Sequence, residues 1–341
     1  MKVLMIGLGG IGQRHVRNLR AVLGDQVDIL AYRVLKRPEV LTEKLKPELG
    51  SSLEEKYRIA VFEDLGEALA QAPDVAFICN PNNLHIPAAI AAAEAGCHLF
   101  VEKPLSHNLE GIEELCRVVE KRNLVALVAY QMRFHPCLLR VKALLEQARV
   151  GRILAVRAEV GEHMPSWHTY EDYRQLYASR RDLGGGVILS QIHEMDYLYW
   201  LFGLPSRVFA LGGHRSGLDI DVEDTASILM DCSGVPVHLH QDYLQRPPVR
   251  TLGVVGDEGK ILVDFRAPKI TVFDGMGTVV ESDSFEGFEP NHVFIEELRH
   301  FLACIEGSQK PRVSLRDGAQ SVRMALAALE SLETGHVLEL R

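Results

Sequence analysis

The sequence lacks long uncharged apolar runs and carries fewer basic than acidic residues. Of its 341 residues, 37 are Lys or Arg and 46 are Asp or Glu, which gives a formal net charge of −9 with His counted as neutral. Such a charge repels phosphate backbones and anionic membranes, so neither nucleic acid nor a membrane surface is an expected partner. No apolar run approaches the ~18 residues that a membrane helix needs. The glycine-interrupted first residues also do not predict a signal peptide.

Cysteine is scarce and unpatterned. The six cysteines stand far apart and form no Cys-x-x-Cys pair: Cys79, Cys97, Cys116, Cys137, Cys232 and Cys304. Several lie in apolar runs, where a free cysteine behaves as a small hydrophobic residue. This usage is typical of a reducing compartment, and we expect the protein in the cytoplasm.

What is present is ordinary globular composition, with 47% apolar and 24% charged residues. At roughly one domain per 150 residues, the length predicts two domains. The first third alternates strand-like and helix-like segments, which predicts a parallel sheet with crossover helices. The expected strands are 2–6, 27–32, 75–79, 98–101 and 124–128, and the expected helices are 11–23, 86–95 and 109–121. The segment 36–56 has an open assignment, in part helical.

The pattern changes after residue 125. A helix at 136–147 is followed by a strand at 153–160, an aromatic-rich irregular stretch, and a helical run that ends near residue 202. Short strands then follow one another without helices between them, which favours an antiparallel sheet. The sequence therefore predicts an α/β protein with two domains. A Rossmann domain with a doubly wound parallel sheet spans 1–124, and an α+β domain with a large, mainly antiparallel open sheet spans 125–341.

A glycine-rich loop follows the first predicted strand. Gly7, Gly9 and Gly12 form a Gly-x-Gly-x-x-Gly pattern at the start of a helix, with Gly10 and Ile11 inside it. The first glycine permits a tight turn, the second lets the backbone approach a pyrophosphate, and the third allows close packing of helix on strand. The helix N-terminus adds N–H groups and a positive dipole end. This placement predicts a dinucleotide site that uses all five residues.

The end of the second predicted strand bears on the choice of cofactor. NAD sites usually offer an acidic residue there, whereas this chain has Arg33, with Lys36 and Arg37 close behind. The Arg33 guanidinium would bind a 2′-phosphate, or it would lie over the adenine or in solvent. The first interpretation is favoured, so NADP is expected in preference to NAD.

Three further motifs complete a family pattern. Glu102-Lys103-Pro104 ends a later strand of the parallel sheet, Asn80-Pro81 begins a turn that reaches His85, and a run of three glycines at 184–186 precedes His193. In this order, and together with the glycine loop, these elements resemble the glucose-fructose oxidoreductase, inositol dehydrogenase and MocA family over essentially the whole chain. The resemblance implies an NAD(P)-dependent dehydrogenase or reductase that acts on sugars, nucleotide sugars or cyclitols. It also implies a homodimer or homotetramer.

The same resemblance implies roles for individual residues. Lys103 would stand beside the nicotinamide and hold the reacting oxygen, since a nearby ammonium stabilises the negative charge that develops as hydride leaves. Glu102 would lie near the cofactor ribose or serve as a partner to Lys103. The expected cofactor contacts also include Asn80, Pro81, His85 and Gln131.

His193 matches the family's histidine in the second domain, where an imidazole can exchange the hydroxyl proton as a general acid or base. Many relatives carry an Asp three or four positions earlier, but this chain has Ser190 and Leu189. Ser190 could bind the ring or the substrate instead, or Lys103 alone could serve the proton transfer.

Four other residues are candidate substrate contacts. Arg133 suits hydroxyl or carboxylate oxygens, or alternatively forms an ion pair at a domain junction. Trp167, His168 and Tyr173 lie in a stretch that combines aromatic rings with polar groups, as carbohydrate sites do.

No metal is expected. His238, His240 and Asp242 alternate along one predicted strand, a spacing that could coordinate a metal, but a polar sheet face at a subunit contact is the favoured interpretation.

Two alternative functions also remain open. One is a glycosidase that retains NAD for transient oxidation, and the other is a dinucleotide-sensing binding protein.

Overall fold

The computed structural model describes residues 1–34, 40–42, 46–48, 50, 52–168 and 170–340. The described chain forms two compact units. The first comprises Met1–Tyr130, His168–Asp172 and Phe294–Ala319, and the second comprises Gln131–Trp167, Tyr173–Val293 and Gln320–Arg341, of which Arg341 lies outside the described residues. Neither unit is one continuous stretch of the chain. The domain boundary that the sequence places between residues 124 and 125 stays a prediction.

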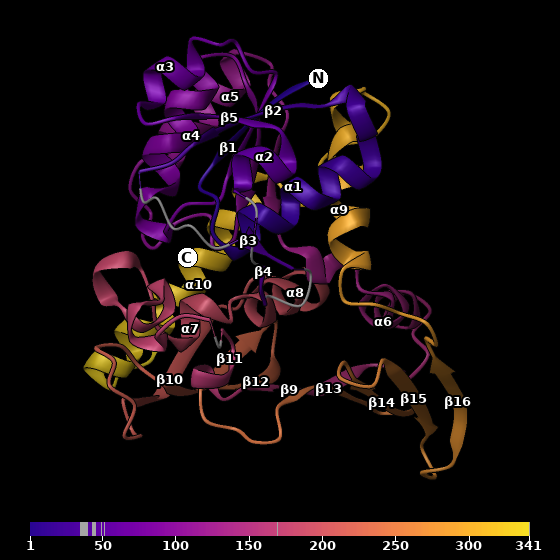
Figure 1. Cartoon of the computed structure of the whole chain (residues 1–341). Coiled ribbons are helices and arrows are strands. Elements are labelled where there is room, and N and C mark those ends of the chain that lie inside the picture. The colour runs from indigo at the N-terminus through magenta and orange to yellow at the C-terminus, as the bar shows by residue number, and fades with distance from the viewer. Residues whose placement is uncertain (35–39, 43–45, 49, 51, 169, 341) are drawn as a thin grey trace. The chain divides into compact units, whose positions relative to one another are not determined.

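The first unit contains a parallel sheet of six strands (Figure 1). Its strands are β1 (Lys2–Ile6), β2 (Asp28–Tyr32), β5 (Ile59–Phe62), β6 (Val75–Ile78), β7 (His98–Glu102) and β8 (Ala126–Ala129). They lie in the order β5-β2-β1-β6-β7-β8, which in chain order is 3-2-1-4-5-6. This is the doubly wound order of dinucleotide-binding sheets, and the predicted Rossmann fold is confirmed.

Helices cover both faces of this sheet. In Figure 1, α4 (His85–Glu94) and α5 (Ile112–Lys121) lie on one side, while α1 (Gly10–Leu23) and α9 (His292–Ile305) lie on the other. The core is apolar and aromatic: the rings of Phe77 and Phe100 stack with centroids 4.5 Å apart, and Phe301 of α9 meets Phe100 edge-on at 5.4 Å. A helix from late in the chain thus completes the core of the first unit.

The segment after β2 contains only short elements in its described part. These are β3 (Val40–Leu41), β4 (Pro47–Glu48), α2 (Leu53–Tyr57) and, after β5, α3 (Leu65–Leu69). Lys36 and Arg37, which the sequence places beside Arg33, lie outside the described residues. The partly helical expectation for this segment therefore has a described counterpart only in α2.

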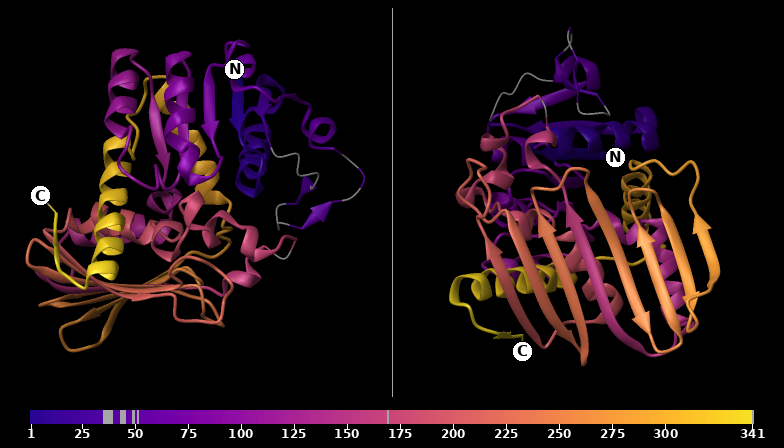
Figure 2. Two further views of the ribbon diagram at one scale, coloured as in Figure 1. Left: turned by 90° about the vertical axis from the view of Figure 1, so that its left-hand side faces the viewer. Right: turned by 90° about the horizontal axis from the view of Figure 1, so that it is seen from below.

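The second unit is built on a sheet of nine strands, seen with its strands side by side in Figure 2. The strand order is β16-β15-β14-β13-β9-β12-β11-β10-β17. The bounds are β9 (Ile153–Gly161), β10 (Arg207–Gly213), β11 (Thr225–Cys232), β12 (Val235–Asp242), β13 (Val249–Gly256), β14 (Gly259–Asp264), β15 (Lys269–Asp274), β16 (Val279–Ser284) and β17 (Leu338–Glu339). All neighbours are antiparallel except β9 and β12, so the predicted large, mainly antiparallel sheet is confirmed.

Helices pack on one face of this sheet. α6 (Pro136–Glu146) contacts β15, α7 (Val187–Ser190) contacts β11 and β12, and α8 (His193–Phe202) contacts β9. The side chains of β9 alternate between the two faces of the sheet: Val156, Ala158 and Val160 are buried, whereas Arg157 is exposed. The single helical run expected before residue 202 is in fact two helices that are interrupted at Gln191 and Ile192. α10 (Leu315–Thr334) follows α9 and leads to β17.

Among the described residues, no helix combines the length and the apolar character that crossing a bilayer demands.

Candidate functional site

The glycine loop joins β1 to α1 at the point where the strand order of the sheet reverses. Gly7 has φ +101°, and a Cβ placed there would meet the Cys79 carbonyl oxygen, just after β6, at 2.7 Å. A Cβ on Gly12 would meet the Gly7 carbonyl oxygen at 2.3 Å. Both positions therefore require glycine for close packing between β1, β6 and α1. Open α/β sheets bind their ligands at this switch point.

Gly9 has a different environment. A Cβ on Gly9 would have no heavy atom within 4 Å, so the backbone there is open to the approach of a ligand. Gly9 is also the N-cap of α1, where no side chain caps the helix and no acidic residue occupies the first turn. The N–H groups at the start of the helix, at Gly10 and Ile11, are consequently suited to phosphate oxygens. These residues fit the pyrophosphate of a dinucleotide.

The Arg33 side chain, just beyond β2, is nearly buried, at 8% exposure. Its Nη1 donates to Glu54 Oε1 of α2 over 3.0 Å. The sequence does not predict this pairing, because 20 residues separate the two positions and nothing in their spacing marks them as neighbours.

The turn after β6 is tied to the segment after β7 by a histidine. His85 is 1% exposed, and its two ring nitrogens lie 2.8 Å from the carbonyl oxygens of Asn80 and Pro104. Burial lowers the pKa of His85, although the two carbonyls and Glu102 act in the opposite direction. His85 therefore connects two loops at the carboxyl edge of the sheet. A direct contact of Asn80, Pro81 or His85 with the cofactor stays a prediction.

Glu102, at the end of β7, is buried and supports its neighbour. Its Oε1 accepts a hydrogen bond from His15 Nε2 of α1 at 2.7 Å, and its Oε2 accepts from the Lys103 backbone N–H at 3.2 Å. Burial alone would raise the pKa of Glu102, but the hydrogen bond and charge of His15, with help from Lys103, hold it below its usual value. Glu102 thus contacts the backbone of Lys103, while its predicted place near the cofactor ribose stays a prediction. Lys103 itself is half-buried at the carboxyl end of the strand.

In the second unit, Arg133 forms a buried ion pair. Its Nε and Nη2 donate to the two carboxylate oxygens of Asp196, each over 2.8 Å. Arg133 is 3% exposed and Asp196 is fully buried, and the Ser321 hydroxyl donates to the same carboxylate. The ion-pair interpretation of Arg133 thus has a structural basis, whereas its contact with substrate stays a prediction. The neighbouring Gln131 begins a short 3₁₀ turn, Gln131–Phe134.

His193 is the first residue of α8 and Ser190 is the last residue of α7, and each is 6% exposed. Between them, Gln191 anchors the pair of helices to β12. The Gln191 amide donates to the Asp242 carbonyl at 3.0 Å, and the Gln241 amide donates to the Gln191 carbonyl at 2.7 Å. A contact of Ser190 with the His193 ring or with the substrate, and a proton-transfer role for His193, stay predictions.

The aromatic candidates are divided between the units. Trp167 and Tyr173 belong to the second unit, and His168 belongs to the first. Trp167 meets Tyr243 edge-on with ring centroids 5.1 Å apart, and the Tyr173 hydroxyl accepts from the Asp219 backbone N–H at 3.2 Å. His168 Nδ1 lies 3.2 Å from Glu171 Oε1. Substrate contact by these three residues stays a prediction.

Two carboxylates in or beside α7 and α8 are not among the residues that the sequence predicts for the site. Glu194 is fully buried and pairs with Arg250 through contacts of 2.7 and 3.1 Å. Glu223 accepts from the Ile188 backbone N–H at 3.1 Å, and burial raises its pKa to about 7. The position of Glu194 directly after His193 could have pointed to it. Glu223 lies 30 residues away from His193, and no sequence feature marks it as a neighbour.

The alternating polar residues of β12 engage one another. His240 bonds to the Ser227 hydroxyl at 2.8 Å and to the Asp242 carboxylate at 3.2 Å. In the part of the chain that the structure describes, no three His, Cys, Asp or Glu side chains are grouped as a metal site would require.

Comparison with known proteins places this geometry in a family. Residues 1–130 match the model of the oxidoreductase family with an NAD-binding Rossmann fold, and residues 138–262 match the model of the GFO/IDH/MocA C-terminal domain. The chain is 25% identical to a myo-inositol 2-dehydrogenase of Thermotoga maritima, with 100% of this chain and 98% of the relative covered. It is 24% identical to a D-xylose 1-dehydrogenase (NADP(+)) of Haloferax volcanii, with 98% of each covered.

Solved structures show the same fold. The WlbA dehydrogenase of Bordetella pertussis, in complex with NADH and UDP-GlcNAcA, superposes with a TM-score of 0.79 at 23% identity, over 100% of this chain and 99% of that one. Together, the two family models cover most of the chain, in the order that the motifs predict. The chain therefore belongs to the GFO/IDH/MocA family and is an NAD(P)-dependent oxidoreductase.

Proposed function

We propose that the chain transfers a hydride between nicotinamide and the carbinol or carbonyl carbon of a sugar, a nucleotide sugar or a cyclitol. The observation that carries this proposal is Lys103, which follows β7 at the carboxyl edge of the doubly wound sheet, the edge where such folds bind their ligands. The relatives support the substrate class, because their names include a cyclitol and a pentose, and one solved relative holds a nucleotide sugar.

Each step of this reaction would use residues of the chain itself. Gly9 and the start of α1 would hold the pyrophosphate of the dinucleotide, whose nicotinamide would supply the hydride acceptor or donor. The Lys103 ammonium stabilises the negative charge that develops on the substrate oxygen. His193 exchanges the hydroxyl proton as general base or acid. His15 and Glu102 hold the backbone of Lys103 in place.

The test uses purified protein with NADH and NADPH. Binding is followed by nicotinamide fluorescence, and turnover by absorbance of the reduced nicotinamide with a panel of sugars, nucleotide sugars, uronic acids and cyclitols. We expect substrate-dependent turnover that Lys103→Ala abolishes, while the variant retains cofactor affinity within about threefold. Unchanged turnover in Lys103→Ala would remove the lysine from the mechanism.

Other outcomes distinguish the alternative functions. Glycoside cleavage without net release of reduced cofactor would indicate a hydrolase that retains NAD. Cofactor binding without any reaction across the panel would favour a dinucleotide sensor.

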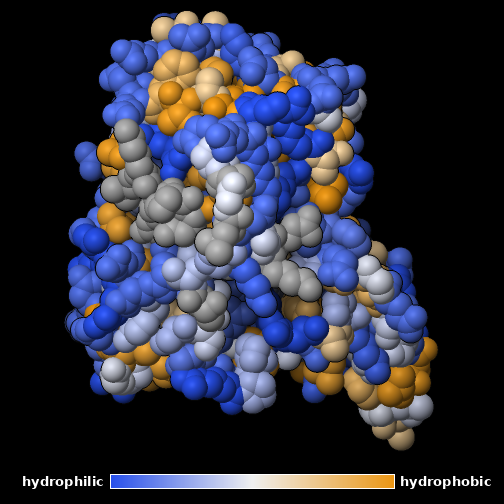
Figure 3. Space-filling view, in the orientation of Figure 1, coloured by the Kyte–Doolittle hydropathy of each residue, from blue (hydrophilic) through white to orange (hydrophobic). Residues whose placement is uncertain are grey.

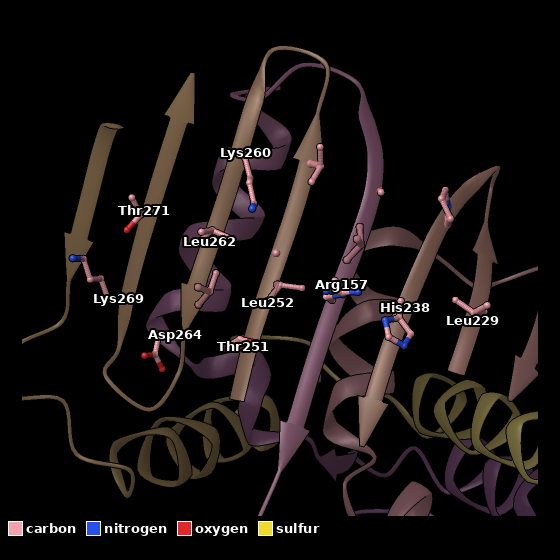
Figure 4. Close-up of a pocket in the computed structure, with 16 residues that line it drawn as sticks. Arg157, Leu229, His238, Thr251, Leu252, Lys260, Leu262, Asp264, Lys269 and Thr271 are labelled. Atoms are coloured by element: carbon pink, nitrogen blue, oxygen red, sulfur yellow. The ribbon is translucent and has the colours of Figure 1, made fainter. Parts of the chain in front are cut away.

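We further propose that the chain forms a homodimer or homotetramer through the face of the nine-stranded sheet opposite α6, α7 and α8. A hollow of about 710 Å³ lies on this sheet. Figure 4 shows that side chains of both charge signs and leucines line it. Leu229 and Leu262 are 52% and 38% exposed there, and Arg157, Lys269 and Asp264 lie among them. A face with both signs of charge can pair with itself about a twofold axis.

Apolar residues are also exposed on the β15–β16 hairpin, at the lower right of Figure 3, where Met276, Val279 and Val280 are 90%, 53% and 42% exposed. We expect sedimentation to show an oligomer and Leu229→Asp to dissociate it, whereas Leu109→Asp, a change at an exposed leucine of the first unit, should not. A monomeric wild-type protein would contradict this proposal.

A cytoplasmic location is part of the same proposal. All six cysteines are buried and free, so the described structure uses no disulfide. Cell fractionation of the native host tests the location directly.

A further inference from the structure

The end of β2 is where dinucleotide sites distinguish NAD from NADP, because the adenosine ribose lies there. In this chain the residue at that place is Arg33, and its guanidinium is already engaged by Glu54 over 3.0 Å. Arg33 is 8% exposed, whereas the side chain of Glu54 is 43% exposed. Of these two described groups, the carboxylate is therefore the one that is more accessible to solvent.

The position of Glu54 is fixed by its own helix. Glu54 lies in the first turn of α2, whose N-cap is Ser52. The Ser52 hydroxyl accepts from the Glu55 backbone N–H, and the Glu55 carboxylate accepts from the Ser52 backbone N–H, which together form a capping box. Glu54 is not part of this cap, so its carboxylate is held on the helix but remains available to Arg33.

The pairing of Arg33 with Glu54 changes which of the two cofactors the site favours. A 2′-phosphate carries two negative charges, so it would have to compete with Glu54 for the Arg33 guanidinium and would be repelled by the same carboxylate. A ribose with a free 2′-hydroxyl meets neither obstacle, and it can donate a hydrogen bond to a carboxylate oxygen. The pair therefore acts against NADP, although Arg33 alone favours it.

We propose that Glu54 is a specificity-determining residue of the dinucleotide site and makes the chain bind NADH more tightly than NADPH. The carboxylate that NAD sites usually carry at the end of the second strand is here supplied from α2. This inference rests on dinucleotide binding by the first unit and deepens the proposed function by selecting between its two cofactors.

The experiment is a pair of fluorescence titrations, with NADH and with NADPH, on the full chain at low ionic strength. In the wild-type protein we expect NADH to bind at least tenfold more tightly, on the order expected for one unfavourable charge near a phosphate. Glu54→Gln should raise the affinity for NADPH by about tenfold and change that for NADH by less. Glu67→Gln, which removes the same charge from an exposed position on α3, should leave both affinities unchanged.

A double variant tests whether Glu54 acts through Arg33. In the Arg33→Met background, Glu54→Gln should improve NADPH binding by less than it does when Arg33 is present, because no guanidinium is released. Equal gains in both backgrounds would contradict the role of the pair. Glu54→Asp, which keeps the charge, should keep the preference for NADH.

The outcomes separate this inference from the function itself. A wild-type protein that binds both cofactors but prefers NADPH would overturn the inference and leave the dehydrogenase intact. The same holds if Glu54→Gln binds NADH and melts at the wild-type temperature, yet keeps the wild-type ratio of affinities. Binding of neither cofactor to the wild-type protein would contradict the proposed function and this inference with it.

Discussion

His15 of α1 and Glu102 of β7 form a hydrogen bond of 2.7 Å between side chains that are 0% and 8% exposed. His15 lies one helical turn after Gly12, and Glu102 directly precedes Lys103. The helix that begins at the glycine loop is thereby connected to the strand that carries the predicted catalytic lysine. The pair thus connects the helix of the proposed pyrophosphate site to the strand that precedes the predicted catalytic lysine, within the first unit.

The first prediction concerns this connection. His15→Leu should lower kcat by about tenfold to a hundredfold with a smaller change in cofactor affinity, because Glu102 then loses the partner that orients it beside Lys103. The measurement is steady-state kinetics together with cofactor titration. His15→Gln retains a side-chain donor and should recover part of the rate, whereas an equally impaired glutamine variant would indicate that His15 acts only in packing.

The second prediction concerns the two glycines that differ in surroundings. Gly9→Val should abolish dinucleotide binding while the melting temperature stays within a few degrees of wild type, because the added side chain enters open space rather than the core. Gly12→Ala should instead destabilise the protein, since its Cβ would collide with the Gly7 carbonyl oxygen. Calorimetry and fluorescence titration of both variants check this contrast. Retained binding in Gly9→Val would show that the cofactor does not approach there.

The third prediction separates structure from substrate contact at Arg133. Arg133→Met should destabilise the protein by about 3–5 kcal/mol, because it leaves the Asp196 carboxylate buried without its partner. The double variant Arg133→Met with Asp196→Leu should recover much of this loss in chemical denaturation. If the stable double variant also has wild-type KM values, Arg133 does not contact the substrate.

The fourth prediction follows from Glu223, whose pKa burial raises to about 7. A raised folded-state pKa means that the folded protein holds the proton more tightly, so the associated stability is fully present below about pH 4.5 and is lost as pH rises to about 7. The loss is about 3 kcal/mol for a shift of this size. Denaturation of wild type and Glu223→Gln at pH 5 and pH 8 measures it. Parallel pH dependence of the two proteins would assign the titration to another group.

Local sequence patterns predicted the architecture because they depend on near neighbours. The alternation of apolar runs with helical periodicity in the first third specifies a parallel sheet, and the glycine loop needs only Gly7, Gly9 and Gly12 in a strand–helix context. Closely spaced strands in the second half predicted the antiparallel sheet in the same way. Those features are confirmed because each is set by backbone geometry within about 30 residues.

Features that depend on distant parts of the chain were not predictable. Phe301 completes the core around Phe77 and Phe100 from more than 200 residues away, and Arg133 reaches Asp196 across 63 positions. The pairing of Arg33 with Glu54 is closer in sequence, yet it depends on how the intervening chain returns to the sheet. For Arg133 and Arg33 the sequence suggests a ligand contact, and only the fold reveals the carboxylate with which each side chain pairs.

The two edges of the nine-stranded sheet also bear on how copies of this chain can associate. At one edge, β17 pairs with β10 at Val208 and Arg207. At the other, the β16 carboxylates Glu281 and Asp283 form ion pairs with Arg140 of α6. Acidic side chains and short edge strands discourage a neighbour from adding another strand. Copies that meet this sheet would therefore stack on its face and form closed assemblies, and continuous fibrils built by lengthening the sheet are disfavoured.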